Sequence, residues 1–163
     1  GSEMCIRDSS GTTVLAFARC IPPEAQLTVL TSAMNVAMAL LNCQQVEVIQ
    51  LGGIVRHTSS SVTGEYALRM LENFSGTKLF LGVDGIDLKY GLTTTNFMEA
   101  SVNRAMIDAA QKIIVLTDSS KFGRRGFGKI CELDAVDQII TDSGVSPKVV
   151  RELEELGIKV SIV

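Results

Sequence analysis

Several short runs in this sequence are apolar at every position instead of at alternate positions, and Ile113-Ile114-Val115-Leu116 is the clearest of them. A strand with apolar side chains on both faces must be covered on both faces. That is the situation of strands in parallel sheets flanked by helices. The pattern therefore predicts a mostly parallel sheet. Its candidate strands are Leu27–Thr31, Val46–Leu51, Lys78–Val83, Ile113–Thr117, Val136–Thr141 and Lys159–Val163.

Segments with helical periodicity lie between these strands. In Phe97–Ala110 the apolar side chains fall on one stripe, and Ser146–Leu156 opens with an N-cap serine followed by a proline. The alternation of strands and helices predicts a doubly wound α/β fold with helices on both faces of the sheet. With 163 residues, of which 46% are hydrophobic, we expect one domain. The other candidate helices are Val14–Cys20, Met34–Leu41 and Gly64–Leu71.

The first residues of the chain do not match this pattern. Gly1-Ser2 resembles the remnant of a cleaved tag, and Glu3–Arg7 has the periodicity of neither a strand nor a helix. We therefore expect residues 1–9 to be a tag or a non-native leader and residues 10–163 to form the domain. An open α/β sheet commonly begins with a strand that leads into its first ligand loop. The sequence predicts no such strand here.

The charge and the cysteine pattern exclude several classes of protein. A net charge of -3 lacks the basic excess with which proteins bind DNA phosphates. Four cysteines without a C-x-x-C pair, and a single histidine, predict reduced thiols in a cytoplasmic protein and no zinc site. The sequence contains no G-x-G-x-x-G fingerprint, no Walker lysine and no membrane-length apolar run. We expect neither a cofactor nor a membrane contact.

Small polar residues precede the first candidate helix. Ser10, Gly11, Thr12 and Thr13 stand where free backbone N–H groups and the helix dipole would favour a phosphate or sulfate. An ordinary Ser/Thr N-cap has the same composition, and this stretch alone leaves both interpretations open.

A second polar junction follows the first candidate strand, where Thr31, Ser32 and Asn35 lead into a helix. The carboxyl ends of parallel strands share one edge of a sheet, which is where open sheets bind ligands. The two polar junctions are therefore expected to line one crevice.

Carboxylates and hydroxyls gather after the strand Lys78–Val83. Asp84 and Asp87 follow it, and Thr93 and Thr94 precede the helix that carries Glu99. Such a set can bind sugar hydroxyls or act in acid–base chemistry, although Asp-Gly is also a common turn pair. Asp84, at the strand end, is the expected ligand, and Asp87 is the expected turn residue.

The strand Ile113–Thr117 is followed by Asp118 and Lys121, which we place on the same edge of the sheet. Lys121 is expected either to pair with Asp84 or to reach a phosphate. Arg124 and Arg125 lie further along and are expected on the solvated surface. His57 has no evident Ser or Cys partner and is expected in an exposed loop.

In this order and at these separations, four stretches resemble the sensor domain of DeoR-family repressors. The resemblance runs from about Ser10 to the C-terminus, and the last of the four motifs is the most specific. They are Leu51-Gly52-Gly53…Arg56…Gly64, Gly82-Val83-Asp84-Gly85-Ile86, Gly91-Leu92-Thr93-Thr94…Glu99 and Asp118-Ser119-Ser120-Lys121-Phe122-Gly123.

The resemblance implies a ribose-5-phosphate isomerase-like fold and a site for a phosphorylated sugar or related metabolite. It also implies that DNA is bound only through an N-terminal winged helix-turn-helix, which is absent from this sequence. The loop at Ser10–Thr13 resembles a phosphate loop, and Asp84 resembles a substrate-binding carboxylate. The expected effector-binding residues are Ser10, Gly11, Thr12, Thr13, Thr31, Ser32, Asn35, Arg56, Asp84, Gly85, Thr93, Thr94, Glu99 and Lys121.

Alternatives to a sensor remain on the same fold, namely a sugar-phosphate isomerase, a sugar-phosphate deaminase and a structural domain without a ligand. The isomerase carries a lysine before a glycine-rich turn, and Lys89 is out of register with it. A site that only binds, with no catalytic residues, is therefore the expected one. Because palindromic operators mirror two-fold protein symmetry, we also expect a homo-oligomer, either a dimer or a tetramer.

Overall fold

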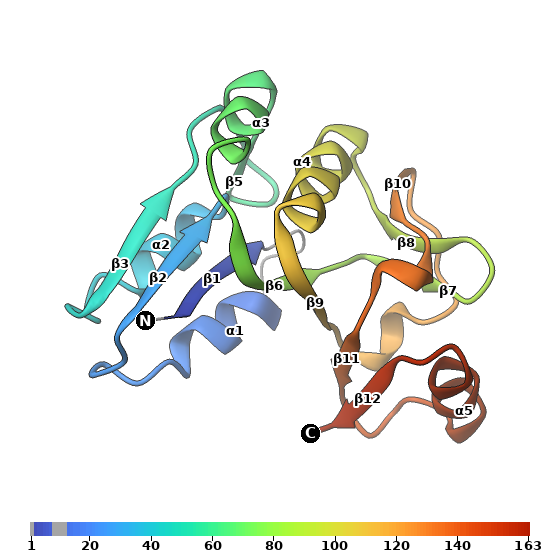
Figure 1. Cartoon of the computed structure of the whole chain (residues 1–163). Helices are drawn as coiled ribbons and strands as arrows, with labels where there is room; N and C mark the ends of the chain where they lie inside the picture. Colours follow the sequence, from blue (N-terminus) through green and yellow to red (C-terminus); the bar gives the residue numbers. More distant parts are fainter. Residues whose placement is uncertain (1, 8–12) are drawn as a thin grey trace.

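The computed structural model (Figure 1) describes residues 2–7 and 13–163, and of residues 2–7 it describes the backbone. Within these residues a seven-stranded sheet has the order β12-β11-β9-β6-β1-β2-β3. Every neighbouring pair is parallel, which confirms the predicted sheet. Its strands are β1 (Ser2–Arg7), β2 (Leu27–Thr31), β3 (Val46–Gln50), β6 (Gly76–Gly82), β9 (Ala110–Leu116), β11 (Gln138–Thr141) and β12 (Lys159–Ile162).

Strand β1 corrects the interpretation of the first residues. Ser2–Arg7, to which the sequence pattern assigns no element, pairs in parallel with β2 on one side and with β6 on the other. The strand that seemed to be missing is therefore inside the sheet, between β6 and β2. Backbone pairing on both sides can hold a segment as a strand without a periodic pattern of its own. The origin of residues 1–9 as a tag or leader stays a prediction.

Helices cover both faces of the sheet, as predicted. The alternating side chains of β9 separate two cores, with Ile113 and Val115 in one and Ile114 and Leu116 in the other. One core includes side chains of α3 (Glu65–Leu71), α4 (Phe97–Asp108) and α5 (Pro147–Glu155). The other includes side chains of α1 (Thr13–Arg19) and α2 (Met34–Ala39). None of the helices in the described ranges combines the length and the apolar character that crossing a bilayer requires.

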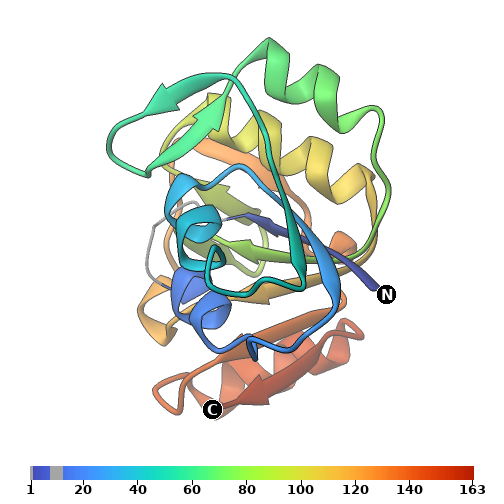
Figure 2. The ribbon, with the colours of Figure 1, turned by 90° about the vertical axis from the view of Figure 1, so that its left-hand side faces the viewer.

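Two small antiparallel sheets extend this framework. One has the order β10-β8-β7, and the other is the hairpin β4–β5, which projects beside α3 (Figure 2). Their strands have three or four residues each, too few for an alternating pattern, and the sequence predicted none of them. The elements are β4 (Ile54–Arg56), β5 (Ser61–Thr63), β7 (Gly85–Asp87), β8 (Gly91–Thr94), β10 (Gly128–Cys131) and the 3-10 turns η1 (Ser119–Lys121) and η2 (Leu133–Ala135).

Asp87 holds the turn between β7 and β8, as the sequence predicted for it. Its carboxylate accepts hydrogen bonds from the backbone N–H groups of Tyr90 (2.8 Å) and Lys89 (2.9 Å) and pairs with Arg125 at 3.1 Å. The bond from Tyr90, followed by those from Arg125 and Lys89, lowers the pKa of Asp87 from its ordinary value of 3.8 to about 2.

We expect Asp87→Asn to lower the melting temperature at pH 7, because the charged carboxylate is the form that these donors stabilise. A lowered pKa contributes stability above the unfolded-state value and loses it as pH falls through the folded-state value. The difference between wild type and variant should therefore shrink as pH falls from 3.8 to about 2. Thermal unfolding at a series of pH values measures it, with Asp108→Asn at an exposed position on α4 as the control. A difference that does not change with pH would contradict the assignment.

Gly91 opens β8 in a conformation that other residues rarely adopt, with φ at 108°. A Cβ at this position would also collide with the carbonyl oxygen of Cys131 on β10. We expect Gly91→Ala to destabilise the protein by roughly 1–3 kcal/mol, the usual cost of overpacking a tight site. Gly52→Ala is the matched control, because a Cβ there meets nothing within 4 Å. Equal melting temperatures for the two variants would refute this.

Candidate functional site

The topology places polar strand ends on one edge of the sheet. Because β1 lies between β2 and β6, the chain leaves the centre of the sheet in opposite directions, which makes a topological switch point. Residues 8–12, which follow β1, are outside the described residues, and with them Ser10, Gly11 and Thr12. Thr13 is half-buried and is the first residue of α1. The phosphate loop stays a prediction.

The loop after β2 is buried. The Thr31 hydroxyl accepts a hydrogen bond from the backbone N–H of Ala33 at 3.0 Å, so this hydroxyl shapes the turn into α2. Ser32 is fully buried, and its hydroxyl has no hydrogen-bond partner among the described residues. The same holds for the buried Oδ1 of Asn35. Ser32 in this loop and Asn35 in the first turn of α2 therefore have polar atoms to offer a ligand.

The hairpin β4–β5 packs against this loop. The Met34 N–H donates to the Ser60 carbonyl at 2.7 Å, and the Val62 N–H donates to the Ser32 carbonyl at 2.9 Å. Arg56, on β4, is half-buried, and its Nε is buried without a partner among the described residues. The structure thus brings the motif around Arg56 to the loop after β2.

Glu99 lies in the first turn of α4 and is only 2% exposed. The Ser61 hydroxyl donates to Oε1 of Glu99 at 3.2 Å, and the Ser59 hydroxyl lies 2.8 Å from that of Ser61. The sequence analysis missed both serines. Three consecutive serines at positions 59–61 are a visible signal, but without the hairpin nothing in the sequence connects them to Glu99.

Asp84 and Thr94 lie together at the end of β6. The Thr94 hydroxyl donates to Oδ2 of Asp84 at 2.7 Å, and the Thr95 N–H donates to the same oxygen at 3.2 Å. Asp84 is half-buried, and its own N–H donates to the Thr93 carbonyl at 3.0 Å. The carboxylate is therefore held in one orientation at the switch point.

Thr93 and Gly85, by contrast with Asp84, contact neighbouring segments of the fold. The Thr93 hydroxyl accepts the Gly126 N–H at 2.7 Å, and a Cβ on Gly85 would come within 2.6 Å of that hydroxyl oxygen. Both residues thus pack β7 and β8 closely against the segment before β10. Contact with a ligand stays a prediction for them.

Lys121 lies in η1, after β9, and the loop that follows η1 reaches β7. The Gly123 N–H donates to the Ile86 carbonyl at 2.7 Å, so this loop runs beside the strand that follows Asp84. No ion pair in the described part of the chain joins Lys121 to Asp84. Hydrogen bonds from Ser120, with a smaller contribution from the charge of Lys121, lower the pKa of Asp118.

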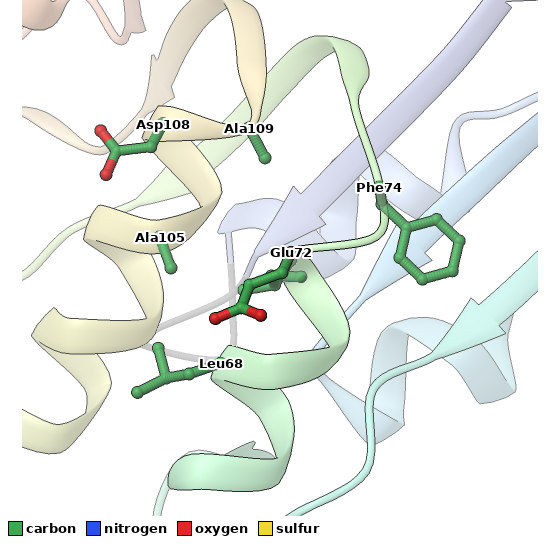
Figure 3. Close-up of a pocket in the computed structure, with 7 residues that line it drawn as sticks. Leu68, Glu72, Phe74, Ala105, Asp108 and Ala109 are labelled. Carbon is green, nitrogen blue, oxygen red and sulfur yellow. The ribbon is translucent and has the colours of Figure 1, made fainter.

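The cavities of the described residues lie at both edges of the sheet, and one of about 470 Å³ beside α2 includes the predicted residue Asn35. A cavity of about 370 Å³ lies between the C-terminal ends of α3 and α4 (Figure 3), which lead into the amino ends of β6 and β9. An apolar cavity of about 530 Å³ lies beside α1 at the carboxyl ends of β9 and β11, where Thr117 and Asp118 line it, and of the predicted effector residues it includes Thr13. Ligands of open α/β sheets bind at the carboxyl ends of the strands, so the cavity between α3 and α4 is on the wrong edge.

Groups suited to metal binding or covalent catalysis do not gather in the described residues. No cluster of three His, Cys, Asp or Glu side chains is found there. His57 is exposed, and Cys20, Cys43 and Cys131 are free thiols. Burial raises the pKa of the Cys131 thiol to about 12, so it remains protonated. The site contains fixed carboxylates, an amide and hydroxyls. These groups can accept hydrogen bonds from a polyhydroxyl ligand and donate hydrogen bonds to it.

Comparison with known proteins identifies relatives along the whole chain. The chain is 42% identical over 154 residues to a putative aga operon transcriptional repressor of Escherichia coli O157:H7, covering 94% of this chain and 57% of that protein. It is 38% identical over 161 residues to the uncharacterized HTH-type transcriptional regulator YulB of Bacillus subtilis strain 168, covering 99% and 62%. It is 28% identical over 152 residues to the glycerol-3-phosphate regulon repressor of Escherichia coli K12, covering 93% and 60%. The chain thus spans about three fifths of the length of these relatives.

A solved structure shows the same fold. The crystal structure of eIF2B beta from Chaetomium thermophilum matches with a TM-score of 0.53 at 15% identity, covering 85% of this chain and 43% of that chain. At this identity the likeness concerns the fold, which is ribose-5-phosphate isomerase-like, as expected.

The sequence model of the DeoR C terminal sensor domain matches residues 2–143, and thus begins within β1. Together with relatives that are transcriptional regulators, this match shows that the chain belongs to the DeoR family, as its C-terminal sensor domain.

Proposed function

We propose that this domain binds a phosphorylated sugar or a related metabolite at the carboxyl edge of the parallel sheet, and that occupancy of this site controls operator binding by the rest of the regulator. The observation that carries the proposal is the Asp84–Thr94 pair, a carboxylate held in place at the switch point of the sheet. One relative is named a glycerol-3-phosphate regulon repressor, which supports a phosphorylated effector.

The residues divide between the two ends of such a ligand. Asp84 accepts hydrogen bonds from sugar hydroxyls, and Ser32, Asn35 and Glu99 contact the sugar from the side of β2 and α4. Lys121 and the loop that ends at Thr13 meet the phosphate. Ser10, Gly11, Thr12, Thr31, Arg56, Gly85, Thr93 and Thr94 complete the proposed contact set.

DNA binding is proposed to belong to a winged helix-turn-helix in the part of the full-length regulator beyond this domain. The relatives that carry the name HTH-type regulator are longer than this chain. Ligand occupancy can change DNA affinity only if the ligand binds differently to the DNA-competent and incompetent states of the homo-oligomer. The domain acts in the cytoplasm, without a cofactor.

Asp84→Ala should weaken the binding of the tightest sugar phosphate roughly ten- to hundredfold, since a charge-assisted hydrogen bond contributes about 1.5–3 kcal/mol. Inorganic phosphate, which lacks the sugar hydroxyls, should bind almost equally to wild type and variant. Titration calorimetry with ribose 5-phosphate, glucosamine 6-phosphate, glycerol 3-phosphate and inorganic phosphate measures both effects.

Thr94→Val is the matched control for this substitution, because it removes the donor to Asp84 and keeps the carboxylate. If Thr94→Val reproduced the whole loss, the bond between Thr94 and Asp84 would be what the sugar requires, and a direct contact of the Asp84 carboxylate with the sugar would have no support. If Asp84→Ala left the affinity unchanged, the effector site would lie elsewhere.

We expect no isomerisation of ribose 5-phosphate and no deamination of amino-sugar phosphates. The resemblance leaves the site without the lysine that the isomerase carries, and Lys89 stands out of register on the turn between β7 and β8. Coupled spectrophotometric assays measure turnover. A rate in the ordinary enzyme range, on the order of 1 per second or faster, would favour the enzyme interpretation over the sensor.

The domain alone should not retain operator DNA. Its net charge of -3 gives no favourable counterion release. A gel-shift assay with the operator of a close relative, competitor DNA and physiological salt tests this, and the full-length regulator serves as the positive control. Specific retention by the domain alone would contradict the assignment of DNA binding to another part of the protein.

A further inference from the structure

A chain of hydroxyl groups leads from the β4–β5 hairpin to the carboxylate of Glu99. The Ser61 hydroxyl donates to Oε1 of Glu99 at 3.2 Å, and the hydroxyls of Ser59 and Ser61 are 2.8 Å apart. A serine hydroxyl has one proton. Because Ser61 donates that proton to Glu99, Ser59 must be the donor in its contact with Ser61. The chain therefore has one direction, from Ser59 through Ser61 to Glu99.

All three side chains of this chain are excluded from solvent. Ser59 is 5% exposed, Ser61 0% and Glu99 2%. A buried carboxylate is strongly disfavoured unless donors replace the water that it has lost. The N-terminal turn of α4, where Glu99 lies, favours a negative charge through the helix dipole. Ser61 adds a directional bond, which fixes where Oε1 lies.

The backbone of the same serines is attached to the loop after β2. Ser61 forms an antiparallel bridge with Ala33, and the Ser60 carbonyl accepts the Met34 N–H at 2.7 Å. Ser60 has φ at 54°, a left-handed conformation that a non-glycine residue keeps only where its surroundings hold it. Ser61 thus contacts the loop of Ser32 through its backbone and Glu99 through its side chain.

The apolar residues of β4 contribute little to the anchoring of this hairpin, whereas Val62 of β5 is buried in the apolar core. Ile54 and Val55, the apolar residues of β4, are 59% and 43% exposed. The hairpin is therefore held through β5, whose residues are buried and which bears the backbone bonds and the Ser61–Glu99 bond. Loss of the Ser61–Glu99 bond should affect the position of Glu99 and the attachment of the hairpin together.

We propose that Ser61, supported by Ser59, is a positioning residue for Glu99, and that through it the β4–β5 hairpin sets the preference of the effector site for the sugar part of its ligand. This inference rests on the proposed function, in which Glu99 contacts the sugar. A carboxylate held at one point selects ligands that place a hydroxyl or amino donor there, because such a ligand gains a charge-assisted hydrogen bond that other ligands do not make. Ser61 itself is fully buried and acts through Glu99.

A double-mutant cycle tests this with Ser61→Ala, Glu99→Gln and the combined variant. Titration calorimetry with ribose 5-phosphate, glucosamine 6-phosphate, glycerol 3-phosphate and inorganic phosphate gives the affinities. Ser61→Ala should weaken the tightest sugar phosphate about tenfold, with inorganic phosphate unchanged. In the Glu99→Gln background the same substitution should cause little further loss. Fully additive losses, or an equal loss for inorganic phosphate, would overturn the proposal.

A second measurement needs no ligand. Hydrogen exchange of the Met34 and Val62 amides, which bond the hairpin to the loop after β2, should be faster in Ser61→Ala and in Glu99→Gln than in wild type. Ser59→Ala, which keeps Ser61, should also speed the exchange of these amides, but by less. It replaces Ser61→Ala in this measurement if Ser61→Ala does not fold. Ser101→Ala on α4, where the hydroxyl bonds the Phe97 carbonyl at 3.1 Å, is the control.

The two measurements separate the two proposals. If no sugar phosphate binds the wild-type protein, the proposed function fails, while exchange rates still report whether Ser61 links the hairpin to Glu99. If sugar phosphates bind and Met34 and Val62 exchange at wild-type rates in every variant, the positioning role of Ser61 is wrong and the proposed function stands.

Discussion

The pairing of β6 with β9 is the interaction on which the rest of this structure depends. The two strands run side by side from Gly76 and Ala110 to Gly82 and Leu116, and their side chains alternate between the two cores. Burial of one such aliphatic side chain contributes roughly 1.5–3 kcal/mol. Because both strands are fixed on both faces, the residues that follow them reach the carboxyl edge of the sheet in defined positions.

The polar groups at that edge receive their orientation from the two small sheets. The β7–β8 turn places Thr94 against Asp84, and the β4–β5 hairpin places Ser61 against Glu99. The parallel sheet alone would provide strand ends without fixed donors and acceptors. Function on a widely shared fold is usually determined by such additions, which is why a likeness in fold shows little about the ligand.

The arrangement also explains how a binding site can serve a sensor. Asp84 follows the central strand β6, whereas Ser32 and Glu99 are joined to the hairpin through Ser61 and its neighbours. A ligand that contacts both groups would restrain the hairpin relative to the sheet. Coupling of this kind needs two states with different ligand affinity, and a hairpin whose β4 strand is largely exposed is the element best suited to differ between them.

The sequence by itself determined the class of the fold, the strands that are apolar on both faces, the helices and the family. These features are local, because the periodicity of a single segment or a motif such as Asp118–Gly123 is enough to predict each of them. Only the tertiary structure decided that Ser2–Arg7 is an interior strand of the sheet, that Thr93 packs against Gly126 and that Ser59 and Ser61 belong beside Glu99. Each of these features depends on partners that are distant in the chain. A strand of three or four residues is too short for its sequence pattern to predict those partners.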